Sequence, residues 1–572
     1  MRFFALLLVC ILLSFCSQQQ RQPDEVRVRL EADPETLNPV SYNSSGGLQI
    51  INLLFQSLLG ADMADAELKP FLAASMPAVT KQDSLTLFTY QIRQEARWAN
   101  GSPVTANDVA FSLKVLKAPL VNNEGLKPQV EFIKDIRLTT ANNRQITFVC
   151  SGYSPEMELL TGDFFILPEY LFDPKGLLKQ FSVKDLNHNA PELQQNKQLQ
   201  EFATRFNSVD FAKNKDLLKG SGGYELDSWV SGQYITLKRK ENWWAKTLDT
   251  TVKHLTANPK RISFQVIPEH ATALLALKSK QLDVLEGIPV AEFNQLQKDK
   301  NFRQDYALHT PDTYEFVYTG LNSRLPKFSD KRTRQAIAHL LDVENLMAVT
   351  QENYATRTVG PVPPSVKELY HHQLKPYTYS VQKAADLLKA AGWTKEKDGW
   401  YKSLNGIREK LTIEISYRAG NTIYENSCAI FKQSAAKAGI PVTIQAVEGA
   451  LLSQKLREHD FEMAFRSLNG NPFIFNFKPL FHTSFAAKGN LNFTGFGTPE
   501  SDKVLDLINQ ANTAQEKAMH LKRLQEMLHE EAAFISLYYL KDRIAIHKRF
   551  ANTKVSGLMP NYDVSAFLLK EQ

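Results

Sequence analysis

The sequence predicts an α/β protein with two lobes, in which mixed sheets are flanked by helices. The chain has 572 residues, well beyond the roughly 250–300 residues at which a single hydrophobic core stops growing. Strand and helix patterns alternate regularly from about 260 to 470, which is typical of a mainly parallel sheet. Residues 24–260 are richer in strands and turns, which indicates a second, different lobe. Two unlike α/β lobes leave a crevice in which a ligand can bind.

Strands are expected where apolar and polar residues alternate with period two. These segments are 26–30, 87–92, 145–150, 234–238, 261–267, 411–417 and 442–447. Helices are expected after the capping residues Thr105, Asp330 and Ser380, and Gly392 follows the third helix where a left-handed residue is favoured. The order strand 411–417, helix 424–438, strand 442–447, helix 451–458 and strand 461–466 predicts a βαβαβ unit.

Composition excludes several classes of protein. The formal net charge is +6 and 22% of residues are charged, and both signs are mixed along the chain, so a nucleic-acid partner is not expected. The cysteines Cys10, Cys16, Cys150 and Cys428 form neither a disulfide framework nor a zinc motif, and we interpret His371-His372 as a solvated pair. No catalytic fingerprint is present. We therefore expect neither an enzyme nor a resident metal or cofactor.

The N-terminus predicts export. Residues 1–16 read as a signal peptide, because the apolar run from Phe3 to Phe15 is shorter than the roughly 20 residues of a membrane-spanning helix. Cys16 ends this run and the polar tether 17–23 follows, an arrangement similar to a bacterial lipobox with Cys16 as the lipidation site. Phe15 stands where a small residue is usual. The alternative is an ordinary signal peptide with a chance cysteine.

Several motifs then follow one another in a characteristic order. They are the strand, tight turn and capped helix of 87–112, Gly220 to Tyr224 with Trp229 and 242–244, and the segments 276–284, 330–337, 360–364 and 384–393. Together they resemble the bacterial extracellular solute-binding proteins of family 5, the dipeptide-, oligopeptide- and nickel-binding components of ABC importers. We expect most of the motif residues to be structural: Trp98, Trp229, Tyr224 and Trp243 as packing, and Asp108 and Asp283 as caps or ion pairs.

The resemblance implies a periplasmic-binding-protein-like fold with an extra domain. The expected divisions are lobe I at 24–42, 205–268 and 535–572, accessory domain II at 43–204, and lobe III at 269–534. We expect a monomer in the periplasm or cell envelope, held to the membrane by a lipid anchor at the lipobox-like Cys16. This protein would capture a peptide or peptide-like solute between its lobes and deliver it to ABC permease subunits. The alternative is a ligand sensor or adaptor of the same fold, uncoupled from transport.

Two segments are expected to bind the ligand. Strand 411–417 leads into Arg418, Asn421 and Tyr424, and in dipeptide binders the corresponding segment offers an arginine, whose guanidinium suits a carboxylate. The second segment contributes Arg466, Asn469 and Asn471.

The second segment departs from the peptide-binding relatives, which carry an aspartate there for the ligand's α-ammonium. Asn469 and Asn471 stand in that region instead. An ammonium group enclosed without a counter-charge is unfavourable. This departure favours an N-blocked or cyclic peptide, or an anionic solute, over a free-amino dipeptide.

Overall fold

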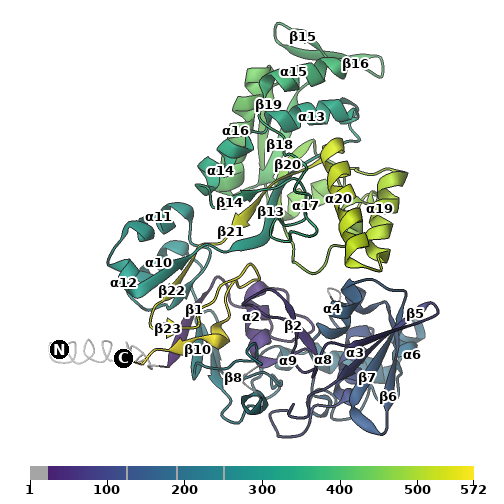
Figure 1. The fold of residues 1–572 in the computed structure, drawn as a ribbon, viewed down its shortest axis with the longest axis vertical. Helices are drawn as coiled ribbons and strands as arrows, with labels where there is room; N and C mark the ends of the chain where they lie inside the picture. The colour runs from purple at the N-terminus through teal and green to yellow at the C-terminus, as the bar shows by residue number, and fades with distance from the viewer. Residues whose placement is uncertain (1–23, 124–125, 188–190, 249–251, 572) are drawn as a thin grey trace, which may run out of the picture.

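The computed structural model describes residues 24–123, 126–187, 191–248 and 252–571 and shows two lobes, one above the other in Figure 1. The predicted signal peptide, Cys16 and the tether 17–23 lie outside the described residues. Among those that are described, no helix is long and apolar enough to cross a bilayer. The predicted two-lobed α/β architecture with mixed sheets is confirmed.

The lower lobe is built on a seven-stranded sheet. Its strands, in spatial order, are β12 (Tyr306–His309), β22 (Ile544–His547), β11 (Val284–Leu285), β1 (Glu25–Leu30), β10 (Arg261–Val266), β9 (Tyr234–Arg239) and β8 (Tyr224–Val230). β1 is parallel to both of its neighbours, β10 and β11. Helices α10 (His270–Lys278), α11 (Val290–Lys298) and α12 (Phe302–Asp305) cover the β12 end with a small core of their own.

The accessory domain lies beside this sheet and shares its hydrophobic core. It holds the antiparallel strands β4 (Ala78–Gln82), β5 (Leu85–Gln91), β7 (Asn142–Ser151) and β6 (Ile133–Thr139), and the pair β2 (Leu59–Ala61) and β3 (Leu68–Pro70). Its helices are α2 (Ser45–Leu54), α3 (Ala106–Lys117), α4 (Glu156–Gly162), α5 (Glu169–Phe172), α6 (Val183–Asn187), α7 (Pro191–Gln195), α8 (Lys197–Phe206) and α9 (Val209–Lys213). Thr105 begins α3 with a capping box to Asp108, as predicted.

The upper lobe is a six-stranded sheet with helices on both faces. Its strands, in spatial order, are β14 (Ala355–Arg357), β21 (Phe534–Lys541), β13 (Asp312–Leu321), β20 (Met463–Asn469), β18 (Ile413–Arg418) and β19 (Val442–Val447). Helices α13 (Lys331–Leu340), α14 (Val343–Gln351), α15 (Val381–Ala390) and α16 (Thr422–Ala438) contribute to one core. Helices α17 (Gly449–Arg457), α18 (Lys478–Phe481), α19 (Pro499–Gln510) and α20 (Ala514–Glu531) contribute to the other.

The predicted βαβαβ unit is confirmed, because β18 pairs in parallel with both β19 and β20. The segments predicted as strands from the period-two pattern all form strands. Asp330 and Ser380 cap α13 and α15 through their side chains, and Gly392 adopts φ +86° beyond α15. A small sheet of β15 (Thr394–Glu396), β16 (Gly399–Leu404) and β17 (Ile407–Lys410) lies at the top of Figure 1.

Sheet membership differs from the expected lobe boundaries at two places. Strands β11 and β12 belong to the lower sheet, although lobe III was expected to begin at 269. Strand β21 belongs to the upper sheet, although lobe I was expected to resume at 535. The alternation pattern reveals that a strand exists but not which strand it pairs with, because pairing joins segments far apart in sequence. The chain therefore crosses between the sheets at 310–311 and at 542–543.

The glycine-tyrosine motif is structural, as expected. The carbonyl of Ser221 accepts hydrogen bonds from the indole nitrogens of Trp243 and Trp244, each at 2.9 Å. The amide of Gly222 donates to the carbonyl of Leu54 at the end of α2, at 3.0 Å. A Cβ atom on Gly222 would collide with the backbone carbonyl of Leu53. This motif therefore joins the lower sheet to the accessory domain by close backbone contact.

We expect Gly222→Ala to lower the free energy of unfolding by about 3 kcal/mol, because backbone atoms cannot move aside as a side chain could. Gly232→Ala is the control, since its Cβ would meet open space and only φ +71° opposes it, which costs about 1 kcal/mol. Denaturant unfolding followed by tryptophan fluorescence measures both values. Equal destabilisation by the two substitutions would contradict the role assigned to Gly222.

Candidate ligand-binding cleft

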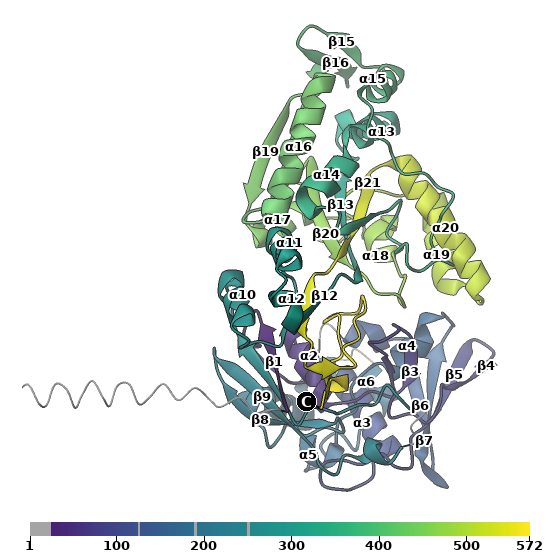
Figure 2. The same ribbon diagram turned by 60° about the vertical axis from the view of Figure 1, so that its left-hand side comes forward.

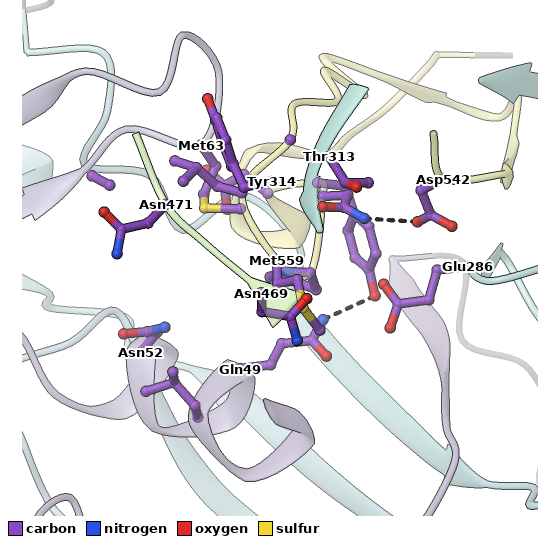
Figure 3. A pocket seen from close by; sticks show the side chains of 18 of the residues that line it. Gln49, Asn52, Met63, Glu286, Thr313, Tyr314, Asn469, Asn471, Asp542 and Met559 are labelled. Carbon is purple, nitrogen blue, oxygen red and sulfur yellow. Dashed lines mark hydrogen bonds between the residues drawn. The ribbon is translucent and has the colours of Figure 1, made fainter. Parts of the chain in front are cut away.

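A cavity of about 760 Å³ lies between the two lobes. Its walls come from three parts of the chain, as Figure 3 shows. Gln49 and Asn52 project from α2 of the accessory domain, and Glu286 follows β11 of the lower sheet. Asn469 and Asn471 come from the end of β20 in the upper lobe. A molecule bound here would contact both lobes.

The two chain crossings form one side of the cavity. The amide of Asp542 donates to the carbonyl of Pro311 at 3.0 Å, and Thr313 Oγ1 donates to the carbonyl of Leu540 at 2.8 Å. Lys541 Nζ forms an ion pair with Asp312 at 3.3 Å. These contacts hold the two crossings side by side. This arrangement allows the lobes to rotate about one short hinge.

A second contact between the lobes lies away from the hinge. Glu156, in the first turn of α4, forms an ion pair with Lys517 of α20, and their side chains are only 4% and 7% exposed. Lys81 of β4 donates to Asn512, just before α20, at 2.8 Å. Figures 1 and 2 both show the lower ends of α19 and α20 above the accessory domain that contains α4. We call the Glu156–Lys517 pair the latch, because opening the cleft would separate its partners.

The cavity lining is rich in acidic side chains. Three lining residues carry a permanent positive charge: Arg29, Lys541 and Arg543. Seven carry a carboxyl group: Glu31, Asp62, Asp163, Glu286, Glu315, Asp542 and Asp563. None of these seven forms an ion pair with any residue that the structure describes.

The three basic residues interact elsewhere. Lys541 pairs with Asp312, which does not line the cavity. Arg29 donates to the carbonyls of Ile267 and Pro268 at 2.8 and 2.6 Å. Arg543 donates to the carbonyl of Ile288 at 2.6 Å. Because both guanidinium groups are committed to backbone carbonyls, they do not pair with the acids of the lining.

Glu286 has the most strongly altered acidity in this group. Burial, and then the neighbouring Asp542, raise its pKa to about 8, against a smaller opposite effect of Arg29. Asp163 faces the open cleft, yet protein surrounds it closely enough to raise its pKa to about 7. Loss of hydration and repulsion from Asp542 thus make the ionisation of Glu286 unfavourable in the ligand-free protein.

The structure brings two of the six predicted site residues into the cavity lining. Asn469 and Asn471 both line it. The Oδ1 atom of Asn471 accepts hydrogen bonds from the amides of Phe473 and Ile474, at 2.9 and 2.7 Å. The side-chain oxygen of Asn471 therefore shapes its own loop, and only its amide nitrogen is available to a ligand.

The other four predicted residues do not line this cavity. Asn421 is the N-cap of α16, where its Oδ1 accepts from the amide of Tyr424 at 3.0 Å, and Tyr424 is 9% exposed in the upper-lobe core. Arg418 is exposed beside Gly449 at the start of α17. Arg466 is half-buried on β20, opposite Tyr318. Both arginines remain predictions as ligand contacts.

The missing aspartate after β20 does not leave the cleft without acidic groups. The segment after β20 does lack an acid, but carboxylates from other segments line the cavity, among them Glu31, Asp163 and Glu286. A positively charged ligand group would therefore have counter-charges in the cleft. No local sequence motif marks these acids, because Glu31, Asp163 and Glu286 come from separate segments that only the folding of the lower lobe and accessory domain brings together.

The described residues offer no obvious metal site: none of their His, Cys, Asp and Glu side chains gather in groups of three or more that could hold an ion. The His371-His372 pair, interpreted as solvated, is only partly so. His372 is exposed, whereas His371 Nε2 lies 2.9 Å from Glu526 Oε1. Cys150 and Cys428 are buried free thiols.

Comparison with known proteins identifies the family. Residues 67–488 match the family described as "Bacterial extracellular solute-binding proteins, family 5 Middle". The chain is 22% identical over 596 aligned residues to the oligopeptide-binding protein AppA of Bacillus subtilis, covering 100% of this chain and 98% of that protein. It is 22% identical over 543 residues to the nickel-binding periplasmic protein of Escherichia coli, covering 93% and 92%.

The solved structures agree on the fold. The structure of AppA from Bacillus subtilis in complex with a nonapeptide superposes with a TM-score of 0.69 at 19% identity, covering 96% of this chain and 99% of that one. The chain therefore belongs to the bacterial extracellular solute-binding proteins of family 5. This membership confirms the predicted family and fold, and it confirms that the chain is a solute-binding protein and not an enzyme.

The latch generates a prediction about closure. We expect Glu156→Gln to favour the open form, because Lys517 would otherwise be buried without a counter-charge, whereas opening returns it to water. Small-angle scattering of the ligand-free protein should show a larger radius of gyration, and ligand affinity should fall about 10-fold.

Two variants control for the latch. Glu500→Gln neutralises the exposed ion pair with Arg523 within the upper lobe and should change neither quantity. The double variant Glu156→Gln/Lys517→Met removes the buried charge and should recover part of the compaction. An unchanged radius of gyration in Glu156→Gln would show that the pair does not hold the lobes together.

Proposed function

We propose that this chain captures a peptide or peptide-like solute between its lobes and delivers it to an ABC importer. The observation that carries the proposal is the cavity at the hinge, which both lobes and the accessory domain line. Its volume of about 760 Å³ lies in the usual range of ligand pockets, roughly 300–1,000 Å³. A relative of the same family is known in complex with a nonapeptide.

The polar lining suits a peptide main chain. Amide side chains reach the cavity from two of its three walls: Gln49, Asn52 and Gln56 from the accessory domain, and Asn469 and Asn471 from the upper lobe. A carboxamide offers both a donor and an acceptor, so it can bind either group of a peptide bond. Tyr42, Phe71 and Phe165 add apolar surface between these amides, where side chains of different sizes could pack.

Ligand capture would work by lobe closure. A ligand that contacts both lobes binds the closed form more tightly than the open form and shifts the equilibrium toward closure. The crossings at 310–311 and 542–543 act as the hinge, and the latch adds an interaction available only when the lobes meet. An importer could then distinguish the closed, loaded protein from the open, empty one.

The proposed location is the cell envelope. The apolar run that ends at Cys16 and the polar tether 17–23 support export followed by lipidation. Two acyl chains at such a cysteine would hold the protein at a membrane surface, whereas a single chain binds only marginally. We propose that the protein acts as a tethered monomer.

The proposed function predicts compaction on loading. Mass spectrometry of small molecules that co-purify with the natively expressed protein identifies the ligand, and scattering compares the loaded and stripped forms. We expect a peptide-like molecule and a smaller radius of gyration when it is bound. A sensor or adaptor would close in the same way, so uptake of the labelled ligand by cells with and without the gene separates import from sensing.

The anchor has its own test. We expect Cys16→Ser to move the protein from the membrane fraction to the soluble fraction of the envelope and to abolish the mass added by acyl chains. Intact-protein mass spectrometry and fractionation measure these effects, with Cys10→Ser as the matched control. Membrane association that persists unchanged in Cys16→Ser would refute lipidation at this residue.

A further inference from the structure

We infer that the cleft selects ligands that carry an organic cation, an ammonium or a guanidinium group, and that Glu286, Asp542 and Asn561 bind this group. We call these three residues the acidic corner. The inference rests on the proposed function, since it names the chemical class of the solute. Glu286 and Asp542 lie on one side of the pocket in Figure 3.

The charge balance of the lining supports a cationic ligand. Seven acidic residues line the cavity, and none pairs with a basic residue that the structure describes. The two lining arginines are held by backbone carbonyls. Enclosing an anionic ligand here would add like-charge repulsion to its loss of hydration, whereas a cation would gain counter-charges from the acids that are already ionised and from Glu286 as it ionises on binding.

The hydrogen bonds of the acidic corner fix its chemistry. Asn561 Nδ2 donates to Asp542 Oδ2 at 2.7 Å. This bond sets the orientation of the amide, because a flipped amide would turn its oxygen toward a carboxylate. Asn561 is 5% exposed, and its Oδ1 has no hydrogen-bond partner among the described residues. A buried acceptor without a donor is unfavourable, so this oxygen marks a position for a ligand donor.

The carboxyl groups of Glu286 and Asp542 supply negative charge beside this neutral amide oxygen. Asp542 accepts from the amide of Gly287 at 3.1 Å, which holds it in place at the hinge. Glu286 lines the cavity and forms no hydrogen bond or ion pair with its side chain among the described residues. Ammonium and guanidinium groups carry several donors and no acceptor, which matches a corner built from three accepting groups.

A second orphaned acceptor lies elsewhere in the same lining. Gln56 is 5% exposed and its Oε1 is buried without a partner among the described residues. Tyr42 and Phe165 lie nearby in the cavity wall, with ring centroids 6.5 Å apart. Aromatic faces attract cations. The cleft thus presents acceptors and π faces at more than one position.

The surroundings of Glu286 predict how binding depends on pH. Asp542 and Glu31 raise its pKa, Arg29 lowers it, and Tyr562 also faces it. With a pKa of about 8 in the ligand-free protein, Glu286 is mostly protonated at pH 6. A cation binds the ionised form, so affinity for a cationic ligand should rise between pH 6 and pH 8.5 and then level off.

The experiment compares three N-acetylated pentapeptides, which lack an α-ammonium group and differ only in the central residue: arginine, citrulline as its uncharged isostere, or glutamate. Calorimetry uses the full protein stripped of bound ligand. We expect the arginine peptide to bind at least 10-fold more tightly than the citrulline peptide, and the glutamate peptide to bind most weakly. Equal or tighter binding of the citrulline peptide would overturn the inference.

The role of the acidic corner is tested by Glu286→Gln. This variant should reduce the arginine-to-citrulline ratio to about 3-fold or less and weaken the pH dependence of binding, leaving the part that comes from Asp163, whose pKa is about 7. Glu241→Gln, at an exposed site outside the cavity, should leave both unchanged. A second variant, Glu31→Gln, should lower the ratio by a smaller amount. An unchanged ratio in Glu286→Gln would overturn the assignment of the corner.

The co-purified ligand separates this inference from the proposed function. A cationic molecule that is not peptide-like would support the charge selectivity and refute the peptide proposal. A peptide without any ammonium or guanidinium group would support the peptide proposal and refute the charge selectivity. Binding of a bare divalent metal that Glu286→Gln abolishes would also refute an organic cation as the selected group.

Discussion

The cleft depends on one constraint, which is that the chain crosses between the two sheets twice at neighbouring points. The hydrogen bond from Asp542 to Pro311 and the ion pair between Lys541 and Asp312 hold these crossings together. In the proposed closure, two crossings side by side would allow rotation and resist sliding, so that the lobes could approach and separate without losing register. Because the cavity lies against the crossings, every ligand contact with the upper lobe is coupled to the hinge angle.

The crossing at 542–543 also contains an acidic residue of the cleft. Asp542 lies at the hinge, is held by the amide of Gly287 and by Asn561, and raises the pKa of Glu286. A ligand cation at this corner would relieve like-charge repulsion at the point where the lobes are joined. Recognition and closure would then draw on the same group of residues. At the other side of the cleft, the latch requires both lobes in contact, because its two partners come from α4 and α20.

The resemblance of motifs identified the fold for a physical reason. In this chain, the indole nitrogens of Trp243 and Trp244 donate to the carbonyl of Ser221, and the amide of Gly222 donates to the last residue of α2, so substitutions there are costly. Such residues identify the fold and give little information about the ligand. The residues of the acidic corner carry no comparable steric restriction, and no motif identifies them.

Local sequence patterns were sufficient for the strands, the capped helices and the βαβαβ unit, because alternation and capping depend on residues close together in the chain. The resemblance to peptide-binding relatives pointed to Asn469 and Asn471, which follow the predicted strand 461–466 and line the cavity. Strand partners could not be predicted in this way. Strand β21 was expected in lobe I but pairs in the upper sheet, and β12 was expected in lobe III but pairs in the lower sheet. The acidic lining of the cavity could not be predicted from the sequence either, because tertiary packing alone brings together Glu31, Asp163, Glu286 and Asp542. Electrostatic environment depends on distance in space, and only the folded chain sets those distances.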